Sequence, residues 1–264
     1  MIVKICIKFF LSVLFFLFLI FVSCKTRQDN SVYFESQLAE AMLVGKVITE
    51  EGLPLEGVKV FLSASLSSVT DISGRFMFKF INFGDYNLKF FKEGYLQEEY
   101  KFSHSFKERK NIPFIKVKML SLNYLINEGY EYLKERKIDE VQETITKLTR
   151  IEPTNEAVLY LKAVLFFDTG KFQDAMEIME KLRYTDRNNQ YYKLTLIKIY
   201  EKLSLFEKQA ALSKYLALSD PRAYYVYFKA AYDIYKNKLN NQKESDECIE
   251  QFNKYNQRYG VTNK

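Results

Sequence analysis

The chain has 264 residues, of which 48% are hydrophobic and 27% are charged. This balance is that of a folded protein and excludes an intrinsically disordered chain, and the length allows one or two domains. The formal net charge of +6 falls to +4 without Lys4 and Lys8, which lie in a leader segment described below. Because so dilute a charge is accompanied by no basic stripe among aromatic residues, nucleic acid is not expected as a partner.

The N-terminus has the layout of a secretory signal peptide. A basic start that ends at Lys8 precedes an apolar stretch over residues 9–22, and Ser23-Cys24 follows. The alternative is a transmembrane anchor, which needs about 18 to 20 apolar residues. Only fourteen residues lie between Lys8 and Ser23. We therefore expect residues 1–23 to be a cleaved leader and the protein to be exported.

The cysteine that ends this stretch resembles the acylated cysteine of bacterial lipoproteins. Val22 and Ser23 fit the lipobox of that family, whereas Phe21 stands where leucine is usual, a looseness also found in spirochaetal lipoproteins. The resemblance implies that Cys24 carries lipid, palmitate included, and anchors the protein at the periplasmic face or the cell surface. Only Cys248 then remains as a thiol, so no internal disulfide is expected.

Residues 43–119 show the alternation of a small all-β sandwich. In the segment RFMFKF, Phe76, Phe78 and Phe80 fall on one face, and the segments VKVFL and YNLKF alternate in the same way. Turns that contain glycine, asparagine or proline separate these short strands. Residues 24–42 are polar and lack periodicity, and we expect them to form a tether.

The order of these segments resembles the carboxypeptidase regulatory-like family, a small transthyretin-like sandwich. The matching motifs are GKV at 45–47, GLPLEGV at 52–58, TD at 70–71, GRF at 74–76, GDY at 84–86 and GY at 94–95. The glycines are expected to supply turn conformations that other residues rarely adopt. The resemblance implies a structural or binding module without peptidase chemistry.

Residues 120–260 have helical spacing and a longer repeat. Small residues recur at multiples of 34 positions, at Gly129, Ala163 and Ala231, and aromatic, leucine and proline positions follow the same period. This pattern resembles the tetratricopeptide repeat (TPR). A generic helical bundle with chance periodicity is the alternative. The expected units are 122–155, 156–189, 190–223 and a degenerate capping unit with a lengthened loop in NKLNNQKES and a displaced closing helix in ECIEQFNKYNQRY.

The sequence therefore predicts a multidomain α and β protein, in which a small all-β sandwich precedes an all-α TPR-like array. Nothing in it predicts catalysis, a metal or a cofactor. His104 is the one histidine and is expected in a solvated loop, and Cys248 is expected to be buried on the apolar side of the last helix. An enzyme with an unfamiliar site is an alternative that no catalytic motif in the sequence supports.

The TPR resemblance implies that the first helices of successive repeats line a concave groove. Tyrosines beside lysines suit the recognition of a peptide segment, because tyrosine offers a large contact area with a polar tip. The alternative is that these side chains pack in the repeat core. The candidate partner-binding residues are Tyr130, Tyr160, Phe167, Lys198, Lys202, Tyr225, Tyr232 and Tyr235.

The expected function is that of a membrane-anchored, non-enzymatic interaction scaffold in the cell envelope, whose partner is another envelope protein or peptide segment. The alternative is that the sandwich binds a cell-wall or host glycan while the repeats act as a spacer. Exposed aromatic residues at the rim of the sandwich, at Phe83, Phe91 and Tyr95, would favour that alternative.

Overall fold

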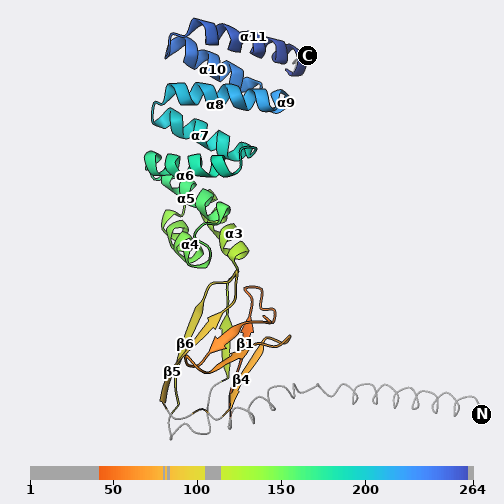
Figure 1. Ribbon diagram of the computed structural model, residues 1–264, viewed down its shortest axis with the longest axis vertical. Coiled ribbons are helices and arrows are strands. Elements are labelled where there is room, and N and C mark those ends of the chain that lie inside the picture. Colours follow the sequence, from red (N-terminus) through yellow and green to blue (C-terminus); the bar gives the residue numbers. More distant parts are fainter. Residues whose placement is uncertain (1–41, 80, 82–83, 105–113, 261–264) are drawn as a thin grey trace, which may run out of the picture. The chain divides into compact units, whose positions relative to one another are not determined.

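The computed structural model describes residues 42–79, 81, 84–104 and 114–260. The predicted leader, Cys24, most of the predicted tether, Phe80 and Phe83 lie outside these residues. The described residues form two compact units, divided at Met119 except that residues 93–96 belong to the second unit. A β-sheet unit thus precedes a helical array, which is the predicted fold class (Figure 1).

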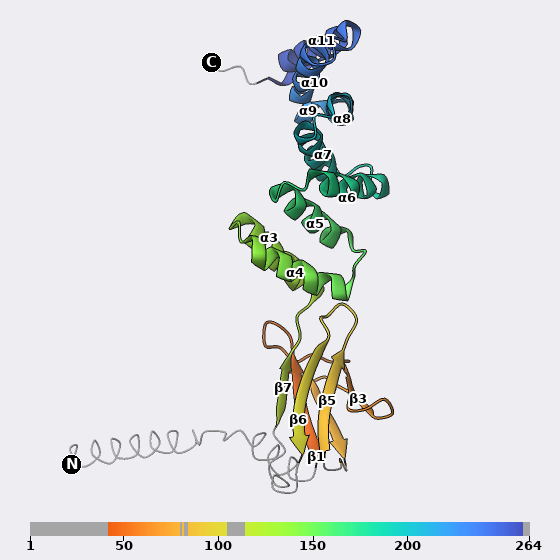
Figure 2. The same cartoon turned by 90° about the vertical axis from the view of Figure 1, so that its left-hand side faces the viewer.

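The first unit contains two sheets. Its strands are β1 (Met42–Ile48), β2 (Lys59–Phe61), β3 (Ser67–Val69), β4 (Arg75–Lys79), β5 (Gly84–Phe91), β6 (Glu98–His104) and β7 (Ile115–Lys118). One sheet has the order β4-β1-β7, in which β1 is antiparallel to β4 and parallel to β7. The other sheet has the order β3-β2-β5-β6 and is antiparallel throughout (Figure 2).

Phenylalanines from both sheets form the core of this unit. Phe76 and Phe78 are buried whereas Met77 between them is 41% exposed, so the predicted alternation along β4 is confirmed. The rings of Phe76 in β4 and Phe90 in β5 meet edge to face, with centroids 5.6 Å apart. This contact joins the two sheets, because β4 and β5 belong to different ones.

Two glycines of the family-like motifs have different roles. Gly74 has a φ of +72°, which is the turn conformation that the sequence predicts. Gly45 lies inside β1, where an added Cβ would collide with the Phe76 ring and the backbone oxygen of Ile115. A turn role is therefore wrong for Gly45, which instead lets β1 lie close to its neighbours.

The second unit is an array of helices that follow one another in chain order (Figure 1). The helices are α3 (Leu122–Lys134), α4 (Ile138–Ile151), α5 (Glu156–Asp168), α6 (Phe172–Thr185), α7 (Gln190–Lys202), α8 (Phe206–Ser219), α9 (Pro221–Tyr224), α10 (Val226–Asn237) and α11 (Gln242–Tyr259). Helices α3, α5, α7 and α10 are the first helices of their units. None of the helices in the described residues is long and apolar enough to cross a bilayer.

Polar side chains cap the first helices of the first three repeats. Ser121, Asn155 and Asn189 precede α3, α5 and α7, and each side chain accepts a hydrogen bond from a backbone N–H of the first turn. The second helices α4, α6 and α8 have no such side-chain cap. They follow a tight turn instead, so the two kinds of helix begin differently in the first three repeats. In the last unit α10 has no side-chain cap and Asn241 caps α11.

The tight turn repeats one backbone conformation. Arg136, Gly170 and Ser204 have φ values of 58°, 77° and 55°, and they are spaced by 34 residues. In the last unit the left-handed residue is Asn240, with a φ of 49°, two positions later than the period requires. The predicted lengthening of the loop is thus small, and the segment QKES, predicted as loop, forms the start of α11.

The small residues predicted at helix contacts are buried. Gly129 in α3, Ala163 in α5 and Ala231 in α10 all lie in the interior of the array. A Cβ added at Gly129 would lie 2.6 Å from Leu161 Cδ2 of α5. The side chain has to be small here because α3 and α5 approach closely, as the repeat pattern predicts.

Candidate partner-binding site

A tyrosine-lined pocket lies on three successive first helices, α3, α5 and α7. Its volume is about 550 Å³. We call it the tyrosine pocket, and its lining residues are Tyr130, Glu156, Ala157, Tyr160, Asn189, Tyr191 and Tyr192.

The tyrosines form a row across the helices. The ring centroids of Tyr130 and Tyr160 are 6.5 Å apart, and those of Tyr160 and Tyr192 are 5.6 Å apart. The hydroxyls of Tyr160 and Thr195 are 3.3 Å apart, and the Tyr192 hydroxyl donates to Glu156 Oε2 at 3.4 Å. Burial, followed by the Glu156 carboxylate, raises the pKa of Tyr192 to about 12, so this phenol stays neutral at physiological pH.

The pocket combines fixed and accessible rings. Tyr192 is buried and Tyr130 and Tyr160 are half-buried, whereas Tyr191 is 72% exposed. Lys198 and Lys202 are exposed on the same side of α7 as Tyr191, because seven and eleven residues are close to two and three helical turns. An extended segment could therefore contact rings in the pocket and ammonium groups further along α7.

The structure brings only some of the predicted residues together. Tyr130 and Tyr160 line the pocket, and Lys198 and Lys202 lie along α7 beyond it. Phe167 is half-buried and meets Phe172 edge to face with centroids 5.5 Å apart. Its ring is thus engaged inside its own repeat.

The three candidates from the last unit lie elsewhere in the array. The Tyr225 ring stacks on Phe252 of α11 at 5.9 Å, and Tyr235 is only 9% exposed. Tyr232 is half-buried on α10, where Lys236 Nζ donates to its hydroxyl at 2.8 Å and Lys229 Nζ lies 4.3 Å from its ring centroid. None of these three side chains lines the tyrosine pocket.

The candidates chosen from the sequence did not include Tyr192, Glu156 or Asn189. Glu156 is the first residue of α5, and Asn189 caps α7. The 34-residue period could have indicated them, because it places the starts of successive first helices beside one another. The pocket is formed by these helix starts as much as by the middle of the helices.

The two residues considered for chemistry are both buried. Cys248 in α11 is fully buried, as predicted, and burial raises the pKa of its thiol to about 11, so the reactive thiolate is scarce at neutral pH. His104 is 9% exposed and ends β6, opposite Gly84 of β5, so the predicted solvated loop is wrong. Among the described residues, no three His, Cys, Asp or Glu side chains are placed to hold a metal ion.

The aromatic residues suggested for the sandwich rim are not gathered in one place. Phe91 ends β5 and is 49% exposed. Tyr95 belongs to the second compact unit, where it pairs with Ser121. Phe83 lies outside the described residues, so the three suggested residues do not form one aromatic surface. A different pair, Tyr86 and Phe102, stacks with ring centroids 5.2 Å apart and lines a pocket of about 630 Å³ in this unit.

A family model of the tetratricopeptide repeat matches residues 132–197, from α3 into α7. The solved structure "MamA AMB-1" is similar over 55% of this chain and 76% of that chain, with 15% identity and a TM-score of 0.46. A tetratricopeptide repeat protein from Parabacteroides merdae ATCC 43184 is similar over 51% of this chain and 52% of that chain, with 14% identity and a TM-score of 0.39. No curated protein matches the chain. The family match confirms tetratricopeptide repeat sequence in residues 132–197, which include the lining residues of the tyrosine pocket except Tyr130.

Proposed function

We propose that the helical unit binds a protein partner through the tyrosine pocket, so that the chain acts as a non-enzymatic interaction scaffold. One observation supports this most strongly: Tyr130, Tyr160 and Tyr191 come from three successive repeats and line a single pocket. Tyrosine is enriched among the residues that dominate binding energy, because it offers a large area with few rotatable bonds. A peptide segment from another protein is the ligand that fits such a surface.

The charges near the pocket favour an extended ligand. Lys198 and Lys202 follow Tyr191 along α7 and are exposed. A segment whose apolar side chain enters the pocket would present its next residues to these ammonium groups. We therefore expect acidic or carbonyl-rich positions in the partner beside the apolar anchor.

We further propose that the protein is an exported lipoprotein and that its partner is another envelope protein. This rests on the sequence alone: the basic start, the short apolar run and Ser23-Cys24. Mass spectrometry of the native N-terminus tests it, and acylated Cys24 with residues 1–23 absent is the expected result. An intact Met1 or an unmodified Cys24 would contradict the proposal, and Cys24→Ser should release the protein from the membrane.

Site-specific crosslinking in the native cells tests which surface binds. A photoreactive phenylalanine analogue replaces Tyr191 in the pocket, Phe91 on the sandwich or Leu218 on α8, all exposed apolar positions. A partner adduct from Tyr191, absent from Leu218, is expected. An adduct from Phe91 and none from Tyr191 would transfer the binding function to the sandwich.

Affinity for the captured partner gives the second test. Truncating an interface anchor typically costs about 2 kcal/mol, roughly thirtyfold in affinity, and we expect this for Tyr191→Ala. Leu218→Ala is the control, because it removes a similarly exposed side chain from a second helix. Both variants should melt like the parent protein. Equal partner capture by both variants would show that the pocket is not the binding site.

A further inference from the structure

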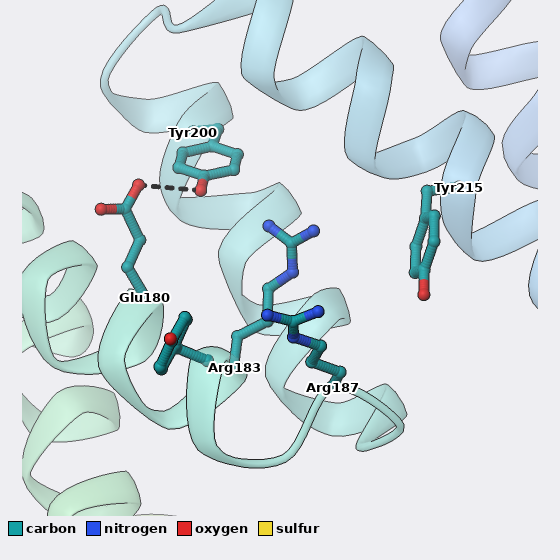
Figure 3. A pocket seen from close by; sticks show the side chains of 6 residues that line it. Glu180, Arg183, Arg187, Tyr200 and Tyr215 are labelled. Carbon is teal, nitrogen blue, oxygen red and sulfur yellow. Dashed lines mark hydrogen bonds between the residues drawn. The ribbon is translucent and has the colours of Figure 1, made fainter.

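A second pocket lies between α6, α7 and α8 and shares no lining residue with the tyrosine pocket. Its volume is about 440 Å³, and its walls are formed by Glu180, Arg183, Tyr184, Arg187, Tyr200 and Tyr215. Figure 3 shows the side chains of Arg183 and Arg187 extending toward the space that Tyr200 and Tyr215 border. Two guanidinium groups therefore face a cavity walled by tyrosines.

The carboxylate of this pocket already has its partners. Glu180 Oε1 lies 2.8 Å from Lys208 Nζ, and the Tyr200 hydroxyl donates to the same oxygen at 3.0 Å. Within the described parts of the chain, no carboxylate forms an ion pair with Arg183 or Arg187. Arg183 therefore interacts with the Glu180 carboxylate only at longer range, and that carboxylate is shared with Lys208.

A buried lysine adds to this charge. Lys193 of α7 is 1% exposed, and its Nζ lies 5.0 Å from the centroid of the Tyr215 ring, which also has the Arg183 guanidinium 6.0 Å away. Its neutral partner is Gln190, whose Oε1 accepts from Nζ at 3.2 Å. Burial, followed by Arg183, lowers the pKa of Lys193, and the Asp186 carboxylate opposes this shift.

We propose that this pocket, the arginine pocket, binds carboxylate side chains of an acidic peptide segment from a partner protein. The planar guanidinium group binds a carboxylate through two parallel hydrogen bonds, which suits Arg183 and Arg187. Tyr184, which is 76% exposed, has the Arg187 guanidinium 5.5 Å from its ring centroid and offers contact area for the neighbouring residues of the ligand. Arg183 is half-buried and Lys193 is buried beside the Tyr215 ring, and only Arg187 is exposed. Since most of this charge lies below the surface among tyrosines, a peptide side chain fits better than a lipid surface.

The arginine pocket is distinct from the tyrosine pocket. Tyr191 and Tyr200 are nine residues apart on α7, which is two and a half helical turns, so they point to opposite sides of that helix. Occupation of one pocket therefore does not block the other. A partner with an acidic segment could be held in addition to the ligand of the tyrosine pocket.

Calorimetric titration of the full chain, purified in detergent at low salt, tests the proposal. The probe is an acetylated and amidated peptide with four consecutive glutamates between leucines, and its control carries glutamine in their place. The glutamate peptide is expected to bind and the glutamine peptide to bind at least tenfold more weakly. Rising salt should weaken the interaction with the glutamate peptide.

Matched charge variants locate the binding site. The double variant Arg183→Gln, Arg187→Gln should weaken binding of the glutamate peptide at least tenfold. The control double variant Arg150→Gln, Arg222→Gln removes the same charge from exposed positions on α4 and α9, and it should change affinity less than twofold. If the first variant unfolds, Arg187→Gln alone, at an exposed position, should still weaken binding at least threefold.

Three results would overturn the proposal. One is equal binding by the pocket and control variants, and another is equal binding of the two peptides. The third is Arg183- and Arg187-dependent binding to phosphatidylglycerol vesicles without binding of the glutamate peptide, which would assign the charges to a membrane surface. Tyr191→Ala should leave peptide affinity unchanged, so failure here is distinguishable from failure of the tyrosine pocket.

Discussion

The two compact units use aromatic residues in different ways. In the β-sheet unit, Phe76 and Phe90 are buried and meet each other between the sheets. In the helical array, Tyr192 and Tyr200 are buried at the ring but donate hydroxyl hydrogen bonds to Glu156 and to Glu180. The phenylalanines pack in an apolar core, whereas the tyrosines pack their rings between helices and form hydrogen bonds with their hydroxyls. Tyr192 lines the tyrosine pocket and Tyr200 lines the arginine pocket, so hydrogen-bonded tyrosines of this kind take part in both pockets.

A core phenylalanine in the β-sheet unit should give the largest effect. Phe90→Ala removes a fully buried ring, which typically costs about 3 to 5 kcal/mol, and should unfold the β-sheet unit. The helical circular dichroism should survive, because the array has hydrophobic clusters of its own. Phe91→Ala, at the exposed neighbouring position, is the control and should cost about 0.5 kcal/mol or less. Loss of the helical signal together with the structure of the β-sheet unit would show that the two units fold as one.

Overpacking the array should give a smaller loss. Ala175 of α6 is fully buried at a position that the repeat pattern assigns to a contact between paired helices. Ala175→Leu should destabilise the array by about 1 to 3 kcal/mol, measured by denaturant unfolding. Ala211→Leu places the same side chain at an exposed position of α8 and should be nearly neutral. Equal stability of the two variants would mean that the close contact at Ala175 does not limit packing.

The sequence predicts the elements well because their signals are local or strictly periodic. Alternation in RFMFKF and the 34-residue spacing of Gly129 and Ala163 each depend on a few neighbouring positions. The burial of Cys248 follows from apolar spacing along one helix. His104 was misplaced because polar residues surround it, although the alternation of β6 continues to its end. Strand pairing with β5, which a loop assignment ignores, buries this side chain.

The candidate site was harder to predict because it depends on how helices lie side by side. Tyr192 and Glu156 belong to different repeats and meet only in the folded array. Tyr225 was expected inside a first helix, but the short helix α9 ends just before it. The side chain is thereby placed at a junction, against Phe252 of α11. The period gives the position of a residue in its repeat and leaves such local breaks unpredicted.

The repeated left-handed turn allows a substitution that stabilises. Ser204 has a φ of 55° in the turn that Gly170 occupies with a φ of 77° in the preceding repeat. A non-glycine residue in this conformation costs roughly 1 to 2 kcal/mol. Ser204→Gly should therefore raise the free energy of unfolding by about 1 kcal/mol, and Gly170→Ala should lower it by a similar amount. Shifts of the same sign in both variants would show that the turn conformation does not control stability here.

The buried phenol of Tyr192 should make the array sensitive to alkali. Its pKa is raised to about 12, above the ordinary tyrosine value near 10. Between these pH values the folded state keeps a proton that the unfolded chain releases, so stability present below about pH 10 is lost as pH rises toward 12. Tyr192→Phe removes this proton and should therefore reduce the loss of stability above about pH 10. At neutral pH the stability should change little, because the hydrogen bond to Glu156 is long.

The measurement for Tyr192 is the urea midpoint of the helical transition as a function of pH. Tyr191→Phe is the matched control, since it deletes the same hydroxyl from a side chain that is 72% exposed in the adjacent position. Above about pH 10, the urea midpoint of Tyr191→Phe should fall with pH as in the parent protein. The midpoint of Tyr192→Phe should fall less steeply, by an amount that corresponds to at most one proton. If the two variants gave the same pH dependence, the Tyr192 phenol would be as free to ionise as an exposed one. Tyr192 would then not be a buried, hydrogen-bonded ring of the kind that distinguishes the array from the phenylalanine core of the β-sheet unit.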